Sequence, residues 1–331
     1  MKVVDMHCDT VLELFEEKKE QKSGSLLSNQ FHIDLEKMIK GDYLLQNFAL
    51  FINLNKTNNP YLHCLELLDT ICCEVQKNND KIRLVKNYAD IKKNQEDGVM
   101  SAMLTVEEGG AIQGSLVNLR NLYRLGVRMM TLTWNYKNEI GYPNCLTPEG
   151  VKVTYGQSNT TNGLTEFGLE LVEEMNRIGM IIDVSHMSDA GFYDVVKYSK
   201  QPFVASHSNA RSICPHVRNM TDDMIRTLSE HGGVMGLNYE GEFLREVTKG
   251  QPLYSKLDIM VAHVKHIINV GGYESLGLGS DFDGINTPQD LKDASCLPML
   301  AQALEDAGLK NQEIEAIFHK NVLRVYRDVL K

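Results

Sequence analysis

The chain has 331 residues, with 34 lysine and arginine residues against 44 aspartate and glutamate residues, so its formal net charge is −10. This acidic excess disfavours partners that are bound through many phosphates, and we expect neither nucleic acid nor an anionic membrane surface as a partner. With 43% hydrophobic and 24% charged residues, the chain can bury a sizeable core, which excludes disorder and a disulfide scaffold.

The amino end of the chain, the lack of a long apolar window and the cysteines predict a cytoplasmic protein. The short apolar run at the amino end is broken by Asp5 and His7, so no signal peptide is expected. No window approaches the roughly 20 apolar residues of a membrane span. The seven cysteines are odd in number and contain no Cys-x-x-Cys pair, which favours free thiols in a reducing compartment over metal ligands. We interpret Cys72 and Cys73 as packing residues.

Short apolar runs alternate with helical patterns along the chain, which is typical of successive βα units. Helical periodicity is clearest over residues 163–178, 221–228 and 257–268, and the tail 311–331 is expected to pack as a helix against the outer or lower surface of the fold. Eight runs are predicted to be strands, over residues 3–7, 44–52, 99–108, 127–134, 180–186, 203–208, 233–239 and 276–283.

The number and character of these strands predict the fold class. Near-continuous apolar strands suit a parallel sheet covered by helices, and eight of them favour a (β/α)8 TIM barrel, with an open doubly wound sheet as the alternative. We predict one domain over residues 1–331. The segment 137–162, rich in Gly, Asn, Pro and Thr, is predicted to be a long loop on the face where active sites form.

Polar residues at the ends of the first and third predicted strands are the first functional signal, because chemistry in this barrel lies where strands end and loops begin. His7 and Asp9 share one face of an extended segment, although Asp9 also resembles a helix N-cap. Glu107 and Glu108 are neighbours and must face opposite ways. Strand parity alone leaves open which of the two acids faces the barrel axis.

The later strands end in further candidate ligands. His186 and His207 close two consecutive apolar runs, so their imidazoles should converge on one patch of the barrel mouth. Asp281 and Asp283 share strand parity, so one could reach the site while the other serves the turn at Gly284. Singly, each of these residues is as easily explained by a structural role.

Together, the strand ends offer three imidazoles and three carboxylates at one mouth. A mixed set of nitrogen and oxygen ligands suits Zn²⁺ or another first-row divalent ion. So many charged groups would be costly to bury without metal charge to offset their repulsion and desolvation. The sequence therefore predicts a metal site.

The chain resembles the membrane (renal) dipeptidase family, peptidase family M19, a branch of the metal-dependent amidohydrolases, over nearly its whole length. The resemblance rests on the order and spacing of seven motifs, which are Asp5-Met6-His7-Cys8-Asp9, Glu108-Gly109-Gly110, Thr131-Leu132-Thr133, Ile182-Asp183-Val184-Ser185-His186, Ser206-His207-Ser208, Arg218-Asn219 and Gly279-Ser280-Asp281-Phe282-Asp283-Gly284.

The resemblance implies a zinc-dependent dipeptidase with two zinc ions per chain. It implies that His7 and Asp9 hold one zinc, that His186 and His207 hold the other, and that Glu108 bridges both. A hydroxide between the metals would attack the peptide bond of a small dipeptide, of L-Xaa-L-Xaa or L-Xaa-D-Xaa type.

The same resemblance implies the roles of the residues around the metals. Asp281 would carry protons and contact the substrate, and Arg218 would bind its terminal carboxylate, as a guanidinium does well. Relatives are often dimers, so the resemblance allows a homodimer and leaves the oligomeric state open.

One residue departs from the family pattern. Vertebrate members carry a substrate-binding histidine where this chain has Trp134, and an indole cannot accept a proton as imidazole does. We expect Trp134 to reshape the substrate pocket. The alternative functions are hydrolysis of N-acyl amino acids or cyclic amides by the same metals, and a non-catalytic metal- or ligand-binding barrel.

Overall fold

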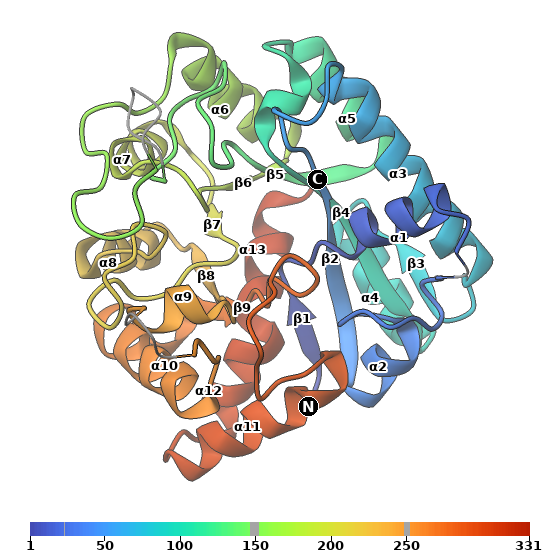
Figure 1. Cartoon of the computed structure of the whole chain (residues 1–331), viewed down its shortest axis with the longest axis vertical. Coiled ribbons are helices and arrows are strands. Elements are labelled where there is room, and N and C mark those ends of the chain that lie inside the picture. The colour runs from blue at the N-terminus through green and yellow to red at the C-terminus, as the bar shows by residue number, and fades with distance from the viewer. Residues whose placement is uncertain (23, 146–151, 248–251) are drawn as a thin grey trace.

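The computed structural model describes residues 1–22, 24–145, 152–247 and 252–331. Eight parallel strands surround a central axis and helices cover them on the outside (Figure 1). The fold is a (β/α)8 TIM barrel, as predicted. Its strands are β1 (Val3–Asp5), β2 (Tyr43–Phe51), β4 (Met100–Glu107), β5 (Val127–Thr131), β6 (Ile181–Asp183), β7 (Val204–Ala205), β8 (Val234–Leu237) and β9 (Leu276–Leu278).

The barrel closes through pairing between strands that are distant in the chain. β1 pairs with both β2 and β9, and β2 pairs with β4 from Leu45↔Ser101 to Phe51↔Glu107. Each of the eight strands lies within one predicted run, except that β2 begins one residue earlier. A ninth strand, β3 (Ile82–Leu84), was not predicted. It pairs with the first residues of β4, and β5 pairs with the later residues on the same edge of β4.

Helices cover the strands in the expected alternation. The predicted helical segments correspond to α6, α8 and α10, whereas the carboxyl-terminal segment is α12 and α13 joined by one π-helical turn, η4. The helices are α1 (Thr10–Lys19), α2 (Leu35–Lys40), α3 (Pro60–Lys77), α4 (Tyr88–Glu96), η1 (Gly109–Ile112), α5 (Leu116–Leu125), α6 (Glu166–Ile178), α7 (Asp189–Tyr198), α8 (Asp222–Glu230), α9 (Gly241–Leu244), α10 (Leu257–Gly271), η2 (Tyr273–Ser275), η3 (Ala294–Cys296), α11 (Leu297–Asp306), α12 (Asn311–Glu315), η4 (Ala316–Lys320) and α13 (Asn321–Val329).

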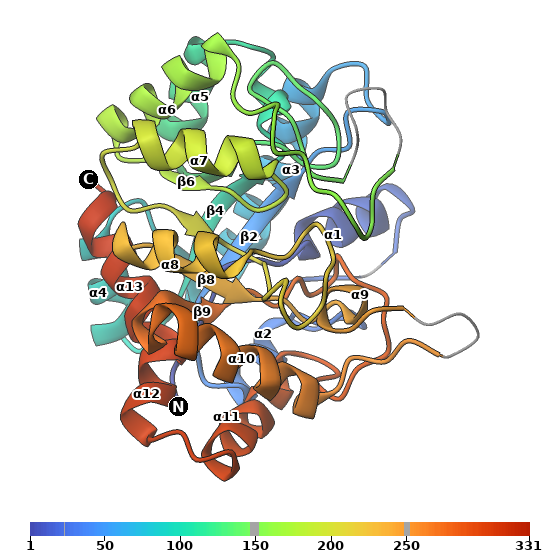
Figure 2. The same ribbon diagram turned by 90° about the vertical axis from the view of Figure 1, so that its left-hand side faces the viewer.

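Two hydrophobic clusters divide the core. The larger lies between the strands and the outer helices, and the smaller fills the barrel interior with side chains such as Val4, Met103 and Ile181. Tyr326 of α13 belongs to the inner cluster, and its hydroxyl is bonded to the Asn47 side chain. In Figure 2, α13 lies at the left-hand end of the strands, while α1 and α9, which follow strand ends, lie further right. The tail therefore closes the end of the barrel at which the strands begin.

The long loop after β5 is folded back onto neighbouring segments. It forms isolated bridges at Gly141↔Leu164, Pro143↔Met187 and Tyr155↔His216. Residues 146–151 of the predicted loop lie outside the described residues. Within the described ranges, no helix combines the length and the apolar character that crossing a membrane requires.

Candidate metal centre

Six candidate residues from five strand ends meet at the end of the barrel where the strands finish and the loops begin. Each is at most 9% exposed, so the cluster is a buried site at the mouth. Its members are His7 and Asp9 after β1, Glu107 at the end of β4, His186 after β6, His207 after β7 and Asp281 after β9.

One half of the site is formed by the two histidines after β6 and β7. The Nε2 atoms of His186 and His207 lie 2.9 Å apart, and they lie 3.0 Å and 3.5 Å from Oε1 of Glu107. Two imidazole nitrogens and one carboxylate oxygen therefore converge on one point. This donor set is one that Zn²⁺ and related divalent ions accept.

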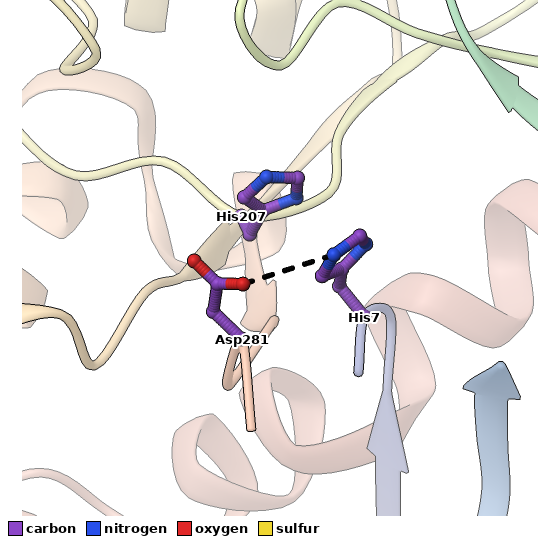
Figure 3. A group of neighbouring side chains, drawn as sticks. All are labelled: His7, His207 and Asp281. Carbon is purple, nitrogen blue, oxygen red and sulfur yellow. Dashed lines mark ion pairs between the residues drawn. The ribbon is translucent and has the colours of Figure 1, made fainter. Parts of the chain in front are cut away.

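The other half is formed by the residues after β1 and β9. Nε2 of His7 lies 3.4 Å from Oε2 of Glu107, 3.5 Å from Oδ2 of Asp9 and 3.8 Å from Oδ1 of Asp281. Figure 3 shows His7 and Asp281 facing each other beside His207, whose ring stacks on that of His7 with centroids 3.9 Å apart. The two oxygens of Glu107 thus serve different halves of the site.

The prediction that Glu108 bridges the metals disagrees with this geometry. Its buried carboxylate points away from the histidines, where it accepts hydrogen bonds from the backbone N–H of Gly110 and Trp134 and from the Asn138 side chain. Glu107 occupies the shared position instead. Through these hydrogen bonds, Glu108 connects the turn after β4 with the loop after β5, so its role in the structure is to hold these two segments together.

The backbone leaves extended geometry as each of three strands ends. Glu108, His186 and Asp281 have φ angles of 91°, 70° and 61°, a region that non-glycine residues rarely adopt. Such conformations cost about 1–3 kcal/mol each and concentrate at functional sites. Because the chain turns sharply here, alternation along an ideal strand does not predict side-chain direction beyond Glu107.

The turn after β9 gives Asp281 and Asp283 different roles, in agreement with the expectation that one reaches the site and the other serves the turn. Asp283 accepts hydrogen bonds from the Thr10 hydroxyl and the His32 backbone N–H, so it serves the turn while Asp281 faces the site. A Cβ atom at Gly284 would lie 2.1 Å from Oδ2 of Asp9. Only glycine lets the turn pass this close to the site.

Hydrogen bonds orient the histidines after β6 and β7. Nδ1 of His207 lies 2.7 Å from Oγ of Ser206, which donates to Asp183, and Nδ1 of His186 lies 3.0 Å from Oδ1 of Asn135. Both rings therefore present Nε2 to the site, the usual way in which outer partners fix a metal-binding imidazole. Sequence reasoning missed Ser206 and Asn135 as partners, although Ser206 directly precedes His207.

The charges of the site are unfavourable without a cation. Burial raises the pKa of the Glu107 and Asp281 carboxyls, and it lowers the pKa of His186 and His207 well below the usual value. Burial alone would also lower the pKa of His7, but the charges of Glu107 and Asp9 outweigh it and raise the pKa well above the usual value. Among the described residues, Nδ1 and Nε2 of His7 and Oδ1 of Asp9 have no hydrogen-bond partner. Buried, unpartnered donors of this kind fit a bound divalent metal.

Arg218 lies beside the site and is 4% exposed. Its Nη2 donates to the His207 carbonyl at 3.1 Å, and its guanidinium lies 5.3 Å from the Phe243 ring. Nε has no hydrogen-bond partner among the described residues. A buried guanidinium with an unpaired N–H donor is suited to an anionic ligand group.

Trp134 lies at the rim of the same site. Its ring centroid is 6.3 Å from that of His186 and 4.8 Å from that of Phe51, which ends β2. Its backbone N–H is bonded to Glu108, so the turn after β4 positions it. The cysteines lie elsewhere: among the described residues, no cysteine belongs to a metal-binding group, and the Cys8 thiol donates to the Asn47 carbonyl.

Three known proteins are similar to this chain in sequence or fold. A dipeptidase of Schizosaccharomyces pombe described as uncharacterised is 34% identical over 309 residues, which cover 89% of this chain and 72% of that protein. A solved metallopeptidase of family M19, dipeptidase AC, superposes with a TM-score of 0.90 at 26% identity and covers 100% of this chain and 99% of its own.

The third is a metallopeptidase from Rhodobacter sphaeroides, solved with a phosphinate mimic of the dipeptide L-Ala-D-Ala. It gives a TM-score of 0.87 at 25% identity, with 99% of both chains covered. The family model described as membrane dipeptidase (peptidase family M19) matches residues 1–331. The chain therefore belongs to the membrane dipeptidase family, peptidase family M19.

Proposed function

We propose that this protein is a dipeptidase that uses two zinc ions to hydrolyse the peptide bond of small dipeptides. The observation that carries the proposal is the shared carboxylate of Glu107. One of its oxygens lies with His186 and His207, and the other lies with His7. We propose Glu107 as the bridging ligand, with His7 and Asp9 on one metal and His186 and His207 on the other.

A bound metal pair supplies Lewis acidity and makes hydroxide available from water near neutral pH. The protein's own groups complete the chemistry. Asn238 donates to Oδ2 of Asp281 at 2.8 Å, which leaves Oδ1 directed towards His7 and the reaction centre. Burial raises the pKa of the Asp281 carboxyl, which suits a group that accepts a proton from water and returns it to the leaving amine.

Arg218 is proposed to bind the terminal carboxylate of the dipeptide. Its burial strengthens such a charge pair, and anchoring one end of the substrate removes orientational freedom before reaction. A carboxylate at Arg218 also limits the substrate length, because the scissile carbonyl must reach the metals that Glu107 and its neighbours would hold.

The test is a panel of L,L and L,D dipeptides assayed with purified protein carrying two equivalents of Zn²⁺, with metal-free protein as the control. We expect turnover that requires metal and a free terminal carboxylate. No turnover of any dipeptide by the fully loaded protein would refute the assignment.

A second candidate is the hydrolysis of N-acyl amino acids. The aromatic contact of Trp134 with Phe51 favours it, because an acyl group is apolar and such a substrate keeps the carboxylate that Arg218 would bind. Comparing each dipeptide with the corresponding N-acetyl amino acid in the same assay separates the two, since only the first carries a free amino group.

A further inference from the structure

We infer that Trp134, with Phe51, forms the subsite for the side chain of the substrate's amino-terminal residue and selects large apolar, above all aromatic, side chains there. This inference rests on the proposed dipeptidase function and names the substrate class. Three aromatic rings carry it, because Trp134 lies 4.8 Å from Phe51 and 5.5 Å from Tyr136 between ring centroids.

The position of these rings relative to Arg218 sets the direction of the substrate. Around the closed barrel the strands follow the order β1, β2, β4, β5, β6, β7, β8 and β9, so β4 is opposite β8. Phe51 ends β2 and Trp134 follows β5, and these two strands are the neighbours of β4. Arg218 follows β7 and faces Phe243, which lies beyond β8. A dipeptide with its carboxylate at Arg218 therefore extends its amino-terminal residue towards Trp134.

The scissile bond lies between these two ends. Glu107 ends β4, and the ring centroid of His186 lies 6.3 Å from that of Trp134. A carbonyl bound at the metal centre that these residues would form therefore places the preceding side chain within reach of Trp134. Trp134 is only half-buried, which leaves part of the indole free for a ligand.

The aromatic pair itself is the apolar surface of the subsite. A cavity of about 570 Å³ between α1 and α3 also touches Phe51, but its other lining residues are mostly polar, such as Glu16, Lys56 and His63. Offset or edge contacts between aromatic rings stabilise beyond simple burial, which is why aromatic substrates should gain most.

The kinetic test uses four dipeptides with one carboxyl-terminal residue, namely Phe-Ala, Leu-Ala, Ala-Ala and Gly-Ala, with zinc-loaded enzyme. We expect kcat/KM to fall in that order. Trp134→Ala should lower the ratio of kcat/KM for Phe-Ala over Gly-Ala by on the order of tenfold, whereas Trp134→Phe should largely keep it. The matched control is Tyr198→Ala, which removes an exposed aromatic ring of α7 and should leave the ratio unchanged.

Trp134 is the only tryptophan in the chain, so its fluorescence reports on the subsite directly. A phosphinate analogue of Phe-Ala should change the emission of Trp134 more strongly than the analogue of Gly-Ala, and thermal melts should establish that each variant folds. Equal loss of kcat/KM for all four dipeptides in Trp134→Ala would overturn the subsite while leaving the dipeptidase function intact. Absence of turnover for every dipeptide would instead remove the proposed function, and the inference with it.

Discussion

The two halves of the candidate metal centre differ in what holds their ligands. On the side of β6 and β7, the imidazoles of His207 and His186 are oriented through their Nδ1 atoms by Ser206 and Asn135. On the side of β1 and β9, Nδ1 of His7 has no hydrogen-bond partner among the described residues.

A buried aspartate supports each half, but in different ways. Asp183 accepts from Ser206 and so acts on the ring of His207, whereas Asp5 accepts from Ser280 and from the backbone N–H of His7. One half is therefore ordered through side chains and the other through backbone and charge. Variants in the two halves should therefore differ in whether they weaken metal binding, catalysis or the stability of the fold.

The largest effect is expected at Glu107, which both halves share. Glu107→Gln should lower kcat/KM by more than the roughly 10- to 100-fold that is typical of changes to outer partners, and the protein should lose bound metal measured by mass spectrometry. Glu108→Gln should keep both metals and lower the melting temperature, since it weakens only the turn. Equal metal loss in the two variants would contradict the assignment of Glu107.

Asp281→Asn should lower kcat by about 10²- to 10⁴-fold, because proton transfer by a positioned group contributes that much. The metal content should stay at the wild-type value. Asp281 lies 3.8 Å from His7, so loss of one metal in the variant would instead show that Asp281 is a ligand of the β1 and β9 half.

The serines test the comparison most directly. Ser206→Ala should weaken metal binding by roughly 10- to 100-fold, because Nδ1 of His207 loses its partner. Ser280→Ala should change metal affinity less but destabilise the protein by about 1–3 kcal/mol, because the buried Asp5 carboxylate loses a donor. Competition with a chelator and urea unfolding of metal-free protein measure the two quantities. Matching losses of affinity would mean that the halves are supported alike.

The smallest effect is a difference in protonation between the halves. In metal-free protein, the raised pKa of His7 stabilises the fold below the unfolded value of about 6.5, and this contribution is lost as pH rises through the raised pKa. The lowered pKa values of His186 and His207 act oppositely, so their contribution falls as pH drops below about 6.5. Imidazole resonances followed by NMR, assigned with single His→Asn variants, should show His7 titrating last as pH rises. A shared titration point for all three rings would remove the distinction.

Much of the fold follows from the sequence, because the eight buried strands are apolar on the face that the helices cover. β3 (Ile82–Leu84) was missed because Arg83 interrupts its short apolar run and because the strand pairs outside the closed ring. The choice between Glu107 and Glu108 depends on which face of β4 turns inward, and only the structure shows this. Ala102, Leu104 and Val106 belong to the cluster under the helices, and Met103 faces the interior, so alternation places Glu107 at the axis.

Contacts that depend on tertiary turns were beyond sequence reasoning. The pairing of Ser206 with Asp183 and of Asn135 with His186 arises only after the strand ends curl into the mouth. The identity of the metal, a homodimer and a cytoplasmic location stay predictions.

The pairing of β1 with β9 has a consequence for how the molecule is made. Asp5 of β1 pairs with Leu278 of β9, and the Asn47 side chain is bonded to the hydroxyl of Tyr326, which is 279 positions away. Neither contact can form until the later residue has been synthesised. Until those residues leave the ribosome, β1 keeps an open edge and the barrel interior stays uncovered. Such distant contacts slow folding and prolong the exposure of unpaired strands. Nascent chains of this protein should therefore depend on chaperones until the last helix emerges.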